Sequence, residues 1–248
     1  MVLAVAMLML LACRPTPSNS IEYLHREDTI IIQMLSLDDG LLEIDRALAV
    51  PEFTLYGDGT LIYQSHMADG TRLLQTSLPE DAVLDLLESI VDEGFLEFTY
   101  AQPTPNTASD ETTFIYAHTR DLANAVSVQG LSAPLAEDAG GEFDQYRKVQ
   151  MLIKMLRALD PVAIGGFDPT TYVAEAYLVA SLTVDGVPTQ EEMTSAEVVE
   201  LLAGFGRTSG SALEDLAIPM RIDPGFGPAV RLAPLLPFHE NFPEFDLQ

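Results

Sequence analysis

A hairpin signal around residue 58 constrains the fold of this chain more than any other feature of its sequence. Two runs rich in aromatic and aliphatic residues, 53–56 and 60–63, flank the tripeptide Gly57-Asp58-Gly59. An Asp-Gly pair tolerates the positive φ angles of a type I′ turn, whose twist matches that of two paired strands. The segment therefore predicts an antiparallel hairpin, and with it a sheet assembled from strands that are neighbours in sequence.

Further strands and helices are expected on both sides of this hairpin. The apolar, β-branched stretch 29–35 predicts a buried strand, and 113–118 with 125–128 predicts a second hairpin. Between the hairpins, Ser77 and Glu80 have the spacing of a capping box, so a helix is expected there, ending at Gly94. A second helix is expected at 142–159, where apolar residues recur at helical spacing.

The chain beyond residue 160 predicts a smaller unit of mixed structure. Its expected elements are a long strand at 172–184, a short helix capped by Thr194 and Glu197, and a last strand at 229–232. Hairpins with helices added, without strict alternation of strand and helix, predict an α+β fold in which helices pack on antiparallel sheet. We expect an N-terminal α+β domain over 21–160 and a C-terminal α+β part over 166–248.

The first twenty residues predict export and lipid attachment. Residues 1–12 are apolar, but twelve helical residues span only about 18 Å, whereas the hydrocarbon core of a bilayer is about 30 Å thick. This length is typical of the apolar core of a signal peptide. The run ends in Leu10-Leu11-Ala12-Cys13, which resembles the lipobox of bacterial lipoproteins. The resemblance implies that Cys13 takes a diacylglycerol and becomes the first residue of the mature chain.

The predicted organisation is therefore a signal peptide at 1–12, followed at 13–20 by the lipidated Cys13 and a flexible tether rich in Pro, Ser and Thr. The lipid bilayer is the expected partner, reached through acylated Cys13. Two features depart from the lipobox pattern, since no Lys or Arg precedes the apolar run and Leu11 is bulky for its position. A cleaved signal peptide with an incidental cysteine, or a buried N-terminal strand, are the alternative readings.

The charge of the chain excludes some classes of partner. Its 38 acidic residues face 12 Lys and Arg, which gives a formal net charge of −26. Such a chain repels nucleic-acid phosphates and anionic headgroups, so we expect no nucleic-acid partner and no membrane attachment through a basic surface. Because Cys13 is the only cysteine, no intramolecular disulfide can form.

One stretch resembles a known group of proteins. The run Val50-Pro51-Glu52-Phe53-Thr54-Leu55-Tyr56-Gly57-Asp58-Gly59-Thr60 is similar to a hairpin signature of uncharacterised exported bacterial lipoproteins. The segments 110–113, 126–128 and 231–237 are similar to the same group, although its members often carry Trp or further Cys in their second half. The resemblance implies export and an α+β fold, and it implies no activity because none is established for the group.

The search for catalytic chemistry yields weak candidates. His25, His66, His118 and His239 are scattered, without the i, i+4 spacing of a metal site on a helix. The stretch 206–210 has the glycine spacing of a nucleophile elbow but places a threonine where the serine belongs, and the glycines at 57–59 and 225–227 lack the spacing of a phosphate loop. We therefore expect no catalytic, cofactor or transition-metal residues from sequence motifs.

Carboxylates and aromatic residues leave further options open. Three groups of acidic residues could supply oxygen ligands to calcium, although none has the order of an EF-hand. The first group is Asp38, Asp39, Glu43 and Asp45, the second is Asp110 and Glu111, and the third is Glu137, Asp138 and Glu142. A hydrolase would need two acids facing each other across a cleft. In the tail, Phe238, Phe242 and Phe245 either fold back onto the core or present an aromatic anchor to a partner.

The sequence thus favours a membrane-anchored lipoprotein whose folded part is a non-catalytic binding or structural module, on the cell surface or in the periplasm. An anchored hydrolase with an acid pair brought together by the fold, and a calcium-stabilised surface protein, are the alternatives. An unidentified protein partner is compatible with all three.

Overall fold

The computed structural model describes residues 21–38, 46, 48–67, 70–98, 111–129, 143–182, 188–205, 220–222 and 230–241. Its larger sheet has seven strands in the order β6-β5-β1-β2-β3-β4-β7, and every neighbouring pair is antiparallel. The strands are β1 (Ile30–Asp38), β2 (Phe53–Tyr56), β3 (Thr60–Met67), β4 (Gly70–Ser77), β5 (Glu111–His118), β6 (Ala123–Gln129) and β7 (Thr170–Thr171).

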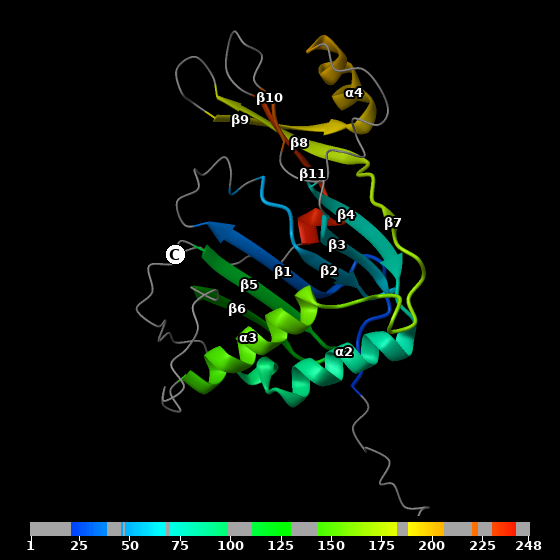
Figure 1. The fold of residues 1–248 in the computed structure, drawn as a ribbon, viewed down its shortest axis with the longest axis vertical. Coiled ribbons are helices and arrows are strands. Elements are labelled where there is room, and N and C mark those ends of the chain that lie inside the picture. Colours follow the sequence, from blue (N-terminus) through cyan, green and yellow to red (C-terminus); the bar gives the residue numbers. More distant parts are fainter. Residues whose placement is uncertain are drawn as a thin grey trace, which may run out of the picture.

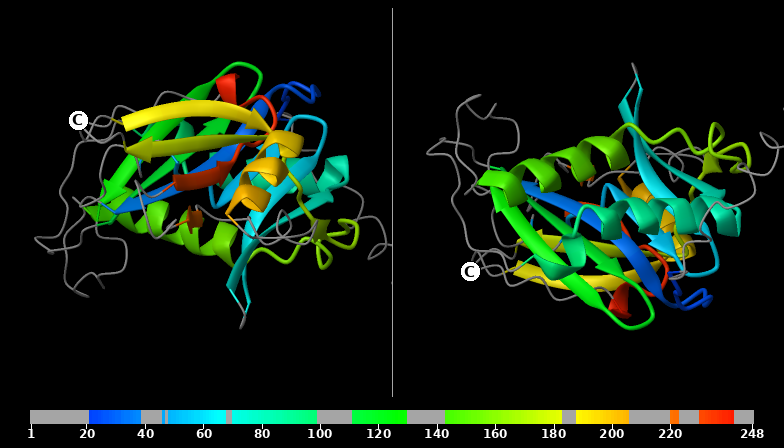
Figure 2. Two further views of the ribbon diagram at one scale, coloured as in Figure 1. Left: turned by 90° about the horizontal axis from the view of Figure 1, so that it is seen from above. Right: turned by 90° about the horizontal axis from the view of Figure 1, so that it is seen from below.

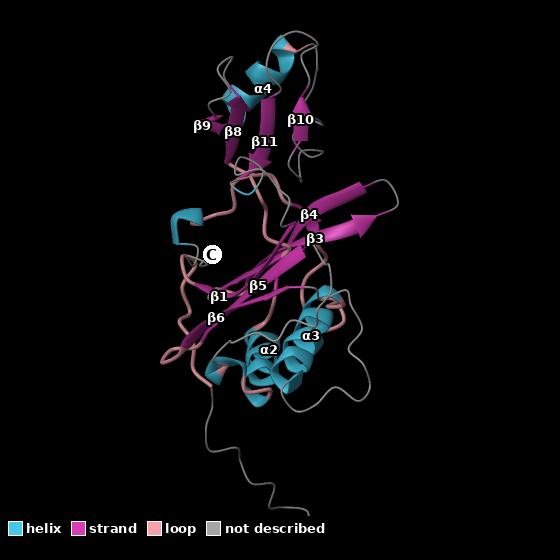
Figure 3. Cartoon of the chain, turned by 90° about the vertical axis from the view of Figure 1, so that its left-hand side faces the viewer, coloured by secondary structure: helices cyan, strands magenta, loops and turns pink. Residues whose placement is uncertain are grey.

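Two helices cover one face of this sheet. They are α2 (Glu80–Asp92) and α3 (Asp144–Arg157), and both lie below the sheet in Figure 3. Their apolar stripes are buried against the sheet in a core that includes Val83, Leu87, Ile32 and Ile115, and a 3-10 turn, η1 (Phe95–Glu97), adds the fully buried Phe95. The fold is therefore α+β, with helices packed on antiparallel sheet, as predicted.

The C-terminal part lies on the opposite face of the large sheet. Strands β8 (Ala176–Leu182), β9 (Pro188–Thr194), β10 (Met220–Ile222) and β11 (Val230–Pro234) form a second antiparallel sheet in the order β10-β11-β8-β9, and α4 (Ser195–Gly204) contacts β8 and β9. A second core joins residues of the two sheets, including Tyr56, Ile62 and Leu73 from the first and Tyr177 and Leu232 from the second. Figures 1 and 2 show this part on the far side of the sheet from α2 and α3.

The hairpin at residue 58 forms as predicted, but the prediction of a type I′ turn was wrong. Leu55 pairs with Leu61, so Gly57-Asp58-Gly59 is a three-residue loop, and only Gly59 has a positive φ, of 87°. The Asp58 carboxylate instead accepts hydrogen bonds from the amide and the hydroxyl of Thr60, at 2.9 Å each. Gly57 is required for another reason, because a Cβ there would lie 1.9 Å from the carbonyl oxygen of Leu24.

The helix ends agree with the sequence only in part. Thr194 and Glu197 form the predicted capping box of α4, and Gly94 has the predicted left-handed conformation, with a φ of 75°. The capping box expected from Ser77 and Glu80 is wrong, because Ser77 is the last residue of β4. The next helix begins at Glu80 with Pro79 as its N-cap, so Ser77 belongs to the sheet, and Leu78 and Pro79 connect β4 to α2.

Several strands were missed or misplaced. The unpredicted β4 and β9 are mostly polar, so they carry few of the buried side chains that reveal a strand. The long strand expected at 172–184 is shorter in the described residues, where it contains only β8, at Ala176–Leu182 in the second sheet. The short β7, which pairs with β4 in the large sheet, ends just before the predicted stretch. Tyr172 lies between β7 and β8. Its amide donates to Leu73 O at 2.9 Å and its hydroxyl donates to Leu235 O at 2.9 Å.

Candidate functional site

A cavity of about 320 Å³ opens where the end of α3 meets β2 and β3. This volume is at the lower end of the range for small-molecule sites, and such sites combine apolar walls with a few polar groups. Most of the cavity wall is apolar, and the polar lining residues are Glu52, Gln64, Ser65, His66 and Arg157. The apolar ones are Met34, Phe53, Leu61, Tyr63, Leu156, Leu159 and Pro161. The arrangement fits a small molecule with an apolar body.

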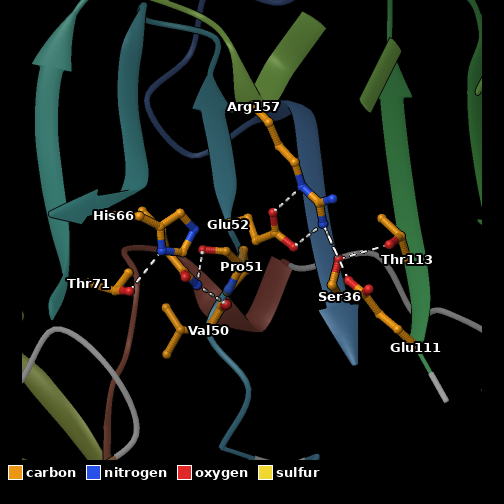
Figure 4. Close-up of polar contacts among 10 residues, drawn as sticks. Ser36, Val50, Pro51, Glu52, His66, Thr71, Glu111, Thr113 and Arg157 are labelled. Atoms are coloured by element: carbon orange, nitrogen blue, oxygen red, sulfur yellow. Dashed lines mark hydrogen bonds and ion pairs between the residues drawn. The ribbon is translucent and has the colours of Figure 1, made fainter. Parts of the chain in front are cut away.

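An ion pair between Glu52 and Arg157 forms one side of this cavity (Figure 4). Arg157 donates from Nε to Glu52 Oε2 at 2.8 Å and from Nη2 to Oε1 at 2.9 Å, which is a bidentate contact. The backbone fixes Glu52 directly before β2, because its amide donates to Met34 O and its carbonyl accepts from the Gln64 amide, both at 2.8 Å. Arg157 is the last residue of α3 and follows the buried Leu156. The pair therefore ties the end of the helix to the sheet.

A second carboxylate and one hydroxyl contact the same guanidinium (Figure 4). Arg157 Nη2 also donates to Ser36 Oγ at 3.1 Å and lies 3.4 Å from Glu111 Oε1. The Ser36 and Thr113 hydroxyls are 2.9 Å apart across β1 and β5. Residues of β1 and β5 and the residue just before β2 thus contact one cation at the end of α3, although no sequence motif links these residues.

The protonation of the pair follows from these contacts. Burial opposes ionisation of Glu52, but hydrogen bonds from Arg157 and Ser36 and the charge of Arg157 outweigh it, so the pKa of Glu52 is lowered. The hydrogen bond to Glu52 raises the pKa of Arg157. Both groups are therefore charged at neutral pH. A carboxylate held ionised in this way is a poor proton donor, whereas a general acid needs a raised pKa.

His66 is the one predicted histidine that lines this cavity. Its Nδ1 lies 2.8 Å from Thr71 Oγ1 across the β3–β4 pair. The neighbouring Gln64 donates from Nε2 to Val50 O at 2.8 Å. The positions of both polar side chains are therefore fixed by hydrogen bonds to neighbouring segments, so the polar side of the cavity is formed in advance of any ligand.

The other predicted histidines lie apart from this site. His25 stacks on Tyr23 with 4.1 Å between ring centroids, His118 lies beside Tyr116, and His239 is 3.8 Å from Glu192. Among the residues that the structure describes, no group of three or more His, Cys, Asp and Glu side chains is placed to hold a metal ion. The structure does not bring these histidines together.

The calcium prediction falls largely outside the described ranges. Of its residues, Asp38 and Glu111 are described, and they are cross-strand partners of β1 and β5. Glu111 lies 3.4 Å from Arg157, and in the described part of the chain it belongs to no group of three or more potential metal ligands. The remaining residues of the three groups, Asp39, Glu43, Asp45, Asp110, Glu137, Asp138 and Glu142, are not described.

A second cavity, of about 480 Å³, lies beneath the C-terminal segment. It is lined by residues of the β7–β8 connection, including Tyr172, and of the segment 235–240. Phe238 lines this cavity and folds back onto the second core, with its ring 6.3 Å from that of Tyr56. The Tyr56 hydroxyl donates to Pro237 O at 2.8 Å. Phe242 and Phe245 lie outside the described residues, as do 206–210, 225–227 and Cys13.

Sequence reasoning missed the Glu52–Arg157 pair. In the sequence, Arg157 is a cation near the end of the second predicted helix, and Glu52 is one of 38 acidic residues. Neither position stands out from the sequence alone. None of the helices in the described ranges is both long and apolar enough to cross a bilayer. No family model, curated protein or solved structure matches this chain. The site must therefore be interpreted from its own geometry.

Proposed function

We propose that this chain is an exported, lipid-anchored binding module. Cys13 holds it on a membrane, and the cavity beside α3 binds a small ligand with an apolar body. The apolar leader that ends at Cys13 supports the membrane address. The ligand site rests on one observation, a cavity of about 320 Å³ with mostly apolar walls and polar groups already fixed by hydrogen bonds.

The ion pair favours binding over catalysis. Glu52 is ionised and bound on both oxygens by Arg157, so neither oxygen is poised to transfer a proton. Glu52 and Glu111 share one guanidinium, which lies where an acid pair would need an open space for substrate. The pair therefore serves to fix the cavity wall.

An anchored hydrolase is the second candidate, and one observation favours it: an acid, Glu52, and a histidine, His66, line the same cavity. In such an enzyme His66 would carry the proton, and the His66→Gln variant would keep ligand affinity while losing turnover. A binding module has no turnover to lose. Calcium stabilisation remains a third prediction, which Asp38 and Glu111 alone do not support.

A reporter in the cavity wall tests the binding proposal. The chain has no Trp, so Tyr63→Trp introduces a single indole beside the cavity, and Met151→Trp places one on the exposed side of α3 as a control. Hexanol, hexylamine and hexanoate share one apolar chain and differ in charge. We expect hexanol and hexylamine to change the fluorescence at position 63, and hexanoate to act more weakly because Glu52, Glu111 and the net charge repel it.

Binding should also stabilise the fold. At a hundredfold excess over Kd, a ligand should add about 2.7 kcal/mol and raise the melting temperature of the unsubstituted protein by about 5–10 °C. Fluorescence and melting temperatures that no member of the series changes at millimolar concentration would contradict a ligand site in this cavity. Equal responses at positions 63 and 151 would contradict its location.

A further inference from the structure

At one end of the large sheet, each of the seven strands has one of its connections to the rest of the chain. Because the strands are antiparallel, the end at which β1 begins also holds the β5–β6 turn, the β2–β3 turn, the connection from β4 to α2 and the chain that leads into β7. The chain that leads into β7 lies at the right of Figure 1, and Figure 2 shows it well separated from the β5–β6 turn, at the other side of the molecule. At a strand spacing of about 4.8 Å, these connections form a row roughly 29 Å long. We refer to this row as the basal end.

Exposed apolar side chains are concentrated at the basal end. They are Leu24 in the segment before β1, Leu122 in the β5–β6 turn, and Val162 and Phe167 in the chain before β7, with exposed fractions of 37%, 56%, 47% and 72%. Only three other large apolar side chains in the described ranges are this exposed: Met151, Val173 and Val199. Single exposed apolar residues need no explanation, whereas several along one edge indicate a contact surface.

The backbone holds these side chains in the exposed position. The Phe167 amide donates to Ser77 O at 3.2 Å, and its carbonyl accepts from Thr76 Oγ1 at 2.6 Å. Leu122 is held in the same way by Thr119, whose amide donates to Leu122 O at 2.8 Å. Gly166 fits only because it lacks a Cβ, which would lie 2.7 Å from Pro161 O. The folded chain therefore presents these residues on a fixed surface.

The predicted tether joins the fold at this same end. Glu22 O accepts a hydrogen bond from the Arg120 amide at 2.7 Å, so the chain just after residue 20 is fixed to the β5–β6 turn. Seven residues, 14–20, span at most about 23 Å when fully extended. If Cys13 is acylated, as the proposed function holds, the basal end is the part of the described fold that this short tether keeps nearest to the bilayer.

The charge of the basal end indicates whether an anionic or a zwitterionic lipid surface fits it better. Arg26 and Arg120 form exposed ion pairs with Asp28 and Glu22, so the two cations neutralise carboxylates of the protein itself. Among the described residues of this end, the exposed Asp121 next to Leu122 and Asp168 next to Phe167 add negative charge, and the net charge of the chain is −26, so electrostatics disfavour an anionic surface. A zwitterionic phospholipid surface fits better, because apolar side chains can enter its interface without charge repulsion.

We infer that the basal end docks on a zwitterionic phospholipid surface through Phe167, Leu122, Val162 and Leu24, and that this contact orients the module while the acyl group retains it. This inference rests on the proposed lipid anchor. The cavity beside α3 then has a fixed orientation relative to the membrane.

The test uses the full acylated protein in phosphatidylcholine vesicles that contain a lipid with brominated acyl chains. Phe167→Trp, Leu122→Trp and Val199→Trp each introduce one indole, and the last lies on α4, beyond the second sheet. We expect the indoles at positions 167 and 122 to be quenched at least twice as strongly as the indole at position 199. Equal quenching at the three positions in protein that floats with the vesicles would overturn docking and leave the anchor intact. Protein that fails to float would overturn both.

Discussion

Replacing Cys13 by serine should move the protein from the membrane fraction to the soluble fraction. The substitution removes the thiol that would carry the lipid, and the net charge of −26 offers no electrostatic attachment in its place. We expect labelled palmitate to disappear from the protein and partitioning into the detergent phase to be lost. Both are measured by phase separation of cells grown with the label.

The tether offers a matched control for this substitution. Ser18→Ala changes a residue of the predicted tether and keeps the thiol, so label and partitioning should remain at the level of the unsubstituted protein. Unchanged partitioning of the Cys13→Ser variant would contradict the lipid anchor. Retained partitioning without label would instead indicate attachment through a part of the chain other than Cys13.

Replacing Arg157 by methionine should lower the free energy of unfolding by about 2 kcal/mol. The change leaves the Glu52 carboxylate, with 15% of its side chain exposed, without its bidentate partner. The cost is below that of a fully buried pair because 41% of the Arg157 side chain is exposed to water. In a protein of this size the melting temperature should fall by about 4–8 °C.

A double-mutant cycle separates the pair from its surroundings. Glu52→Gln alone should cost about 1 kcal/mol, because the half-exposed guanidinium can be hydrated. The double variant should be less destabilised than the sum of the two single variants, by about 1 kcal/mol. Arg147→Met is the control on the same helix, since the Arg147–Asp144 pair is exposed and should contribute no more than about 0.5 kcal/mol. Additive effects of Glu52→Gln and Arg157→Met would contradict the coupling.

The Glu52–Arg157 pair also predicts the direction in which the stability of the fold changes with pH. The pKa of Glu52 is lower in the folded protein than in the unfolded chain, so the folded state favours its ionised form. This contribution is complete above the unfolded pKa of a glutamate and is lost as the pH falls through the lowered folded pKa. Urea unfolding from neutral pH into the acid range should therefore show a smaller loss of stability in Glu52→Gln than in the unsubstituted protein.

Local patterns in the sequence predicted several elements whose signals are local, although the local Ser77–Glu80 pattern was wrong. The hairpin at residue 58 follows from Asp-Gly between two apolar runs, and the cap of α4 follows from Thr194 and Glu197. Both depend on residues within a few positions of one another. The turn type was wrong because Asp58 bonds Thr60 through its side chain, which fixes a loop with one positive φ at Gly59.

The site could not be predicted because its contacts are distant in sequence. Glu52 and Arg157 are 105 residues apart, and Ser36 and Arg157 are 121 apart. The strand order places them together, since β1 lies between β5 and β2. In the stretch 170–182, the change from the large sheet at β7 to the second sheet at β8 also depends on partners far along the chain, β4 and β11. No periodicity within the stretch carries that information.

The mass of the mature N-terminus tests the lipid anchor most directly. Protein purified from membranes of the native host, digested and analysed by mass spectrometry, should yield an N-terminal peptide that begins at Cys13 and carries a diacylglycerol on its sulfur. A peptide that begins at Met1, with an unmodified thiol at Cys13, would contradict the anchor and the membrane docking that rests on it.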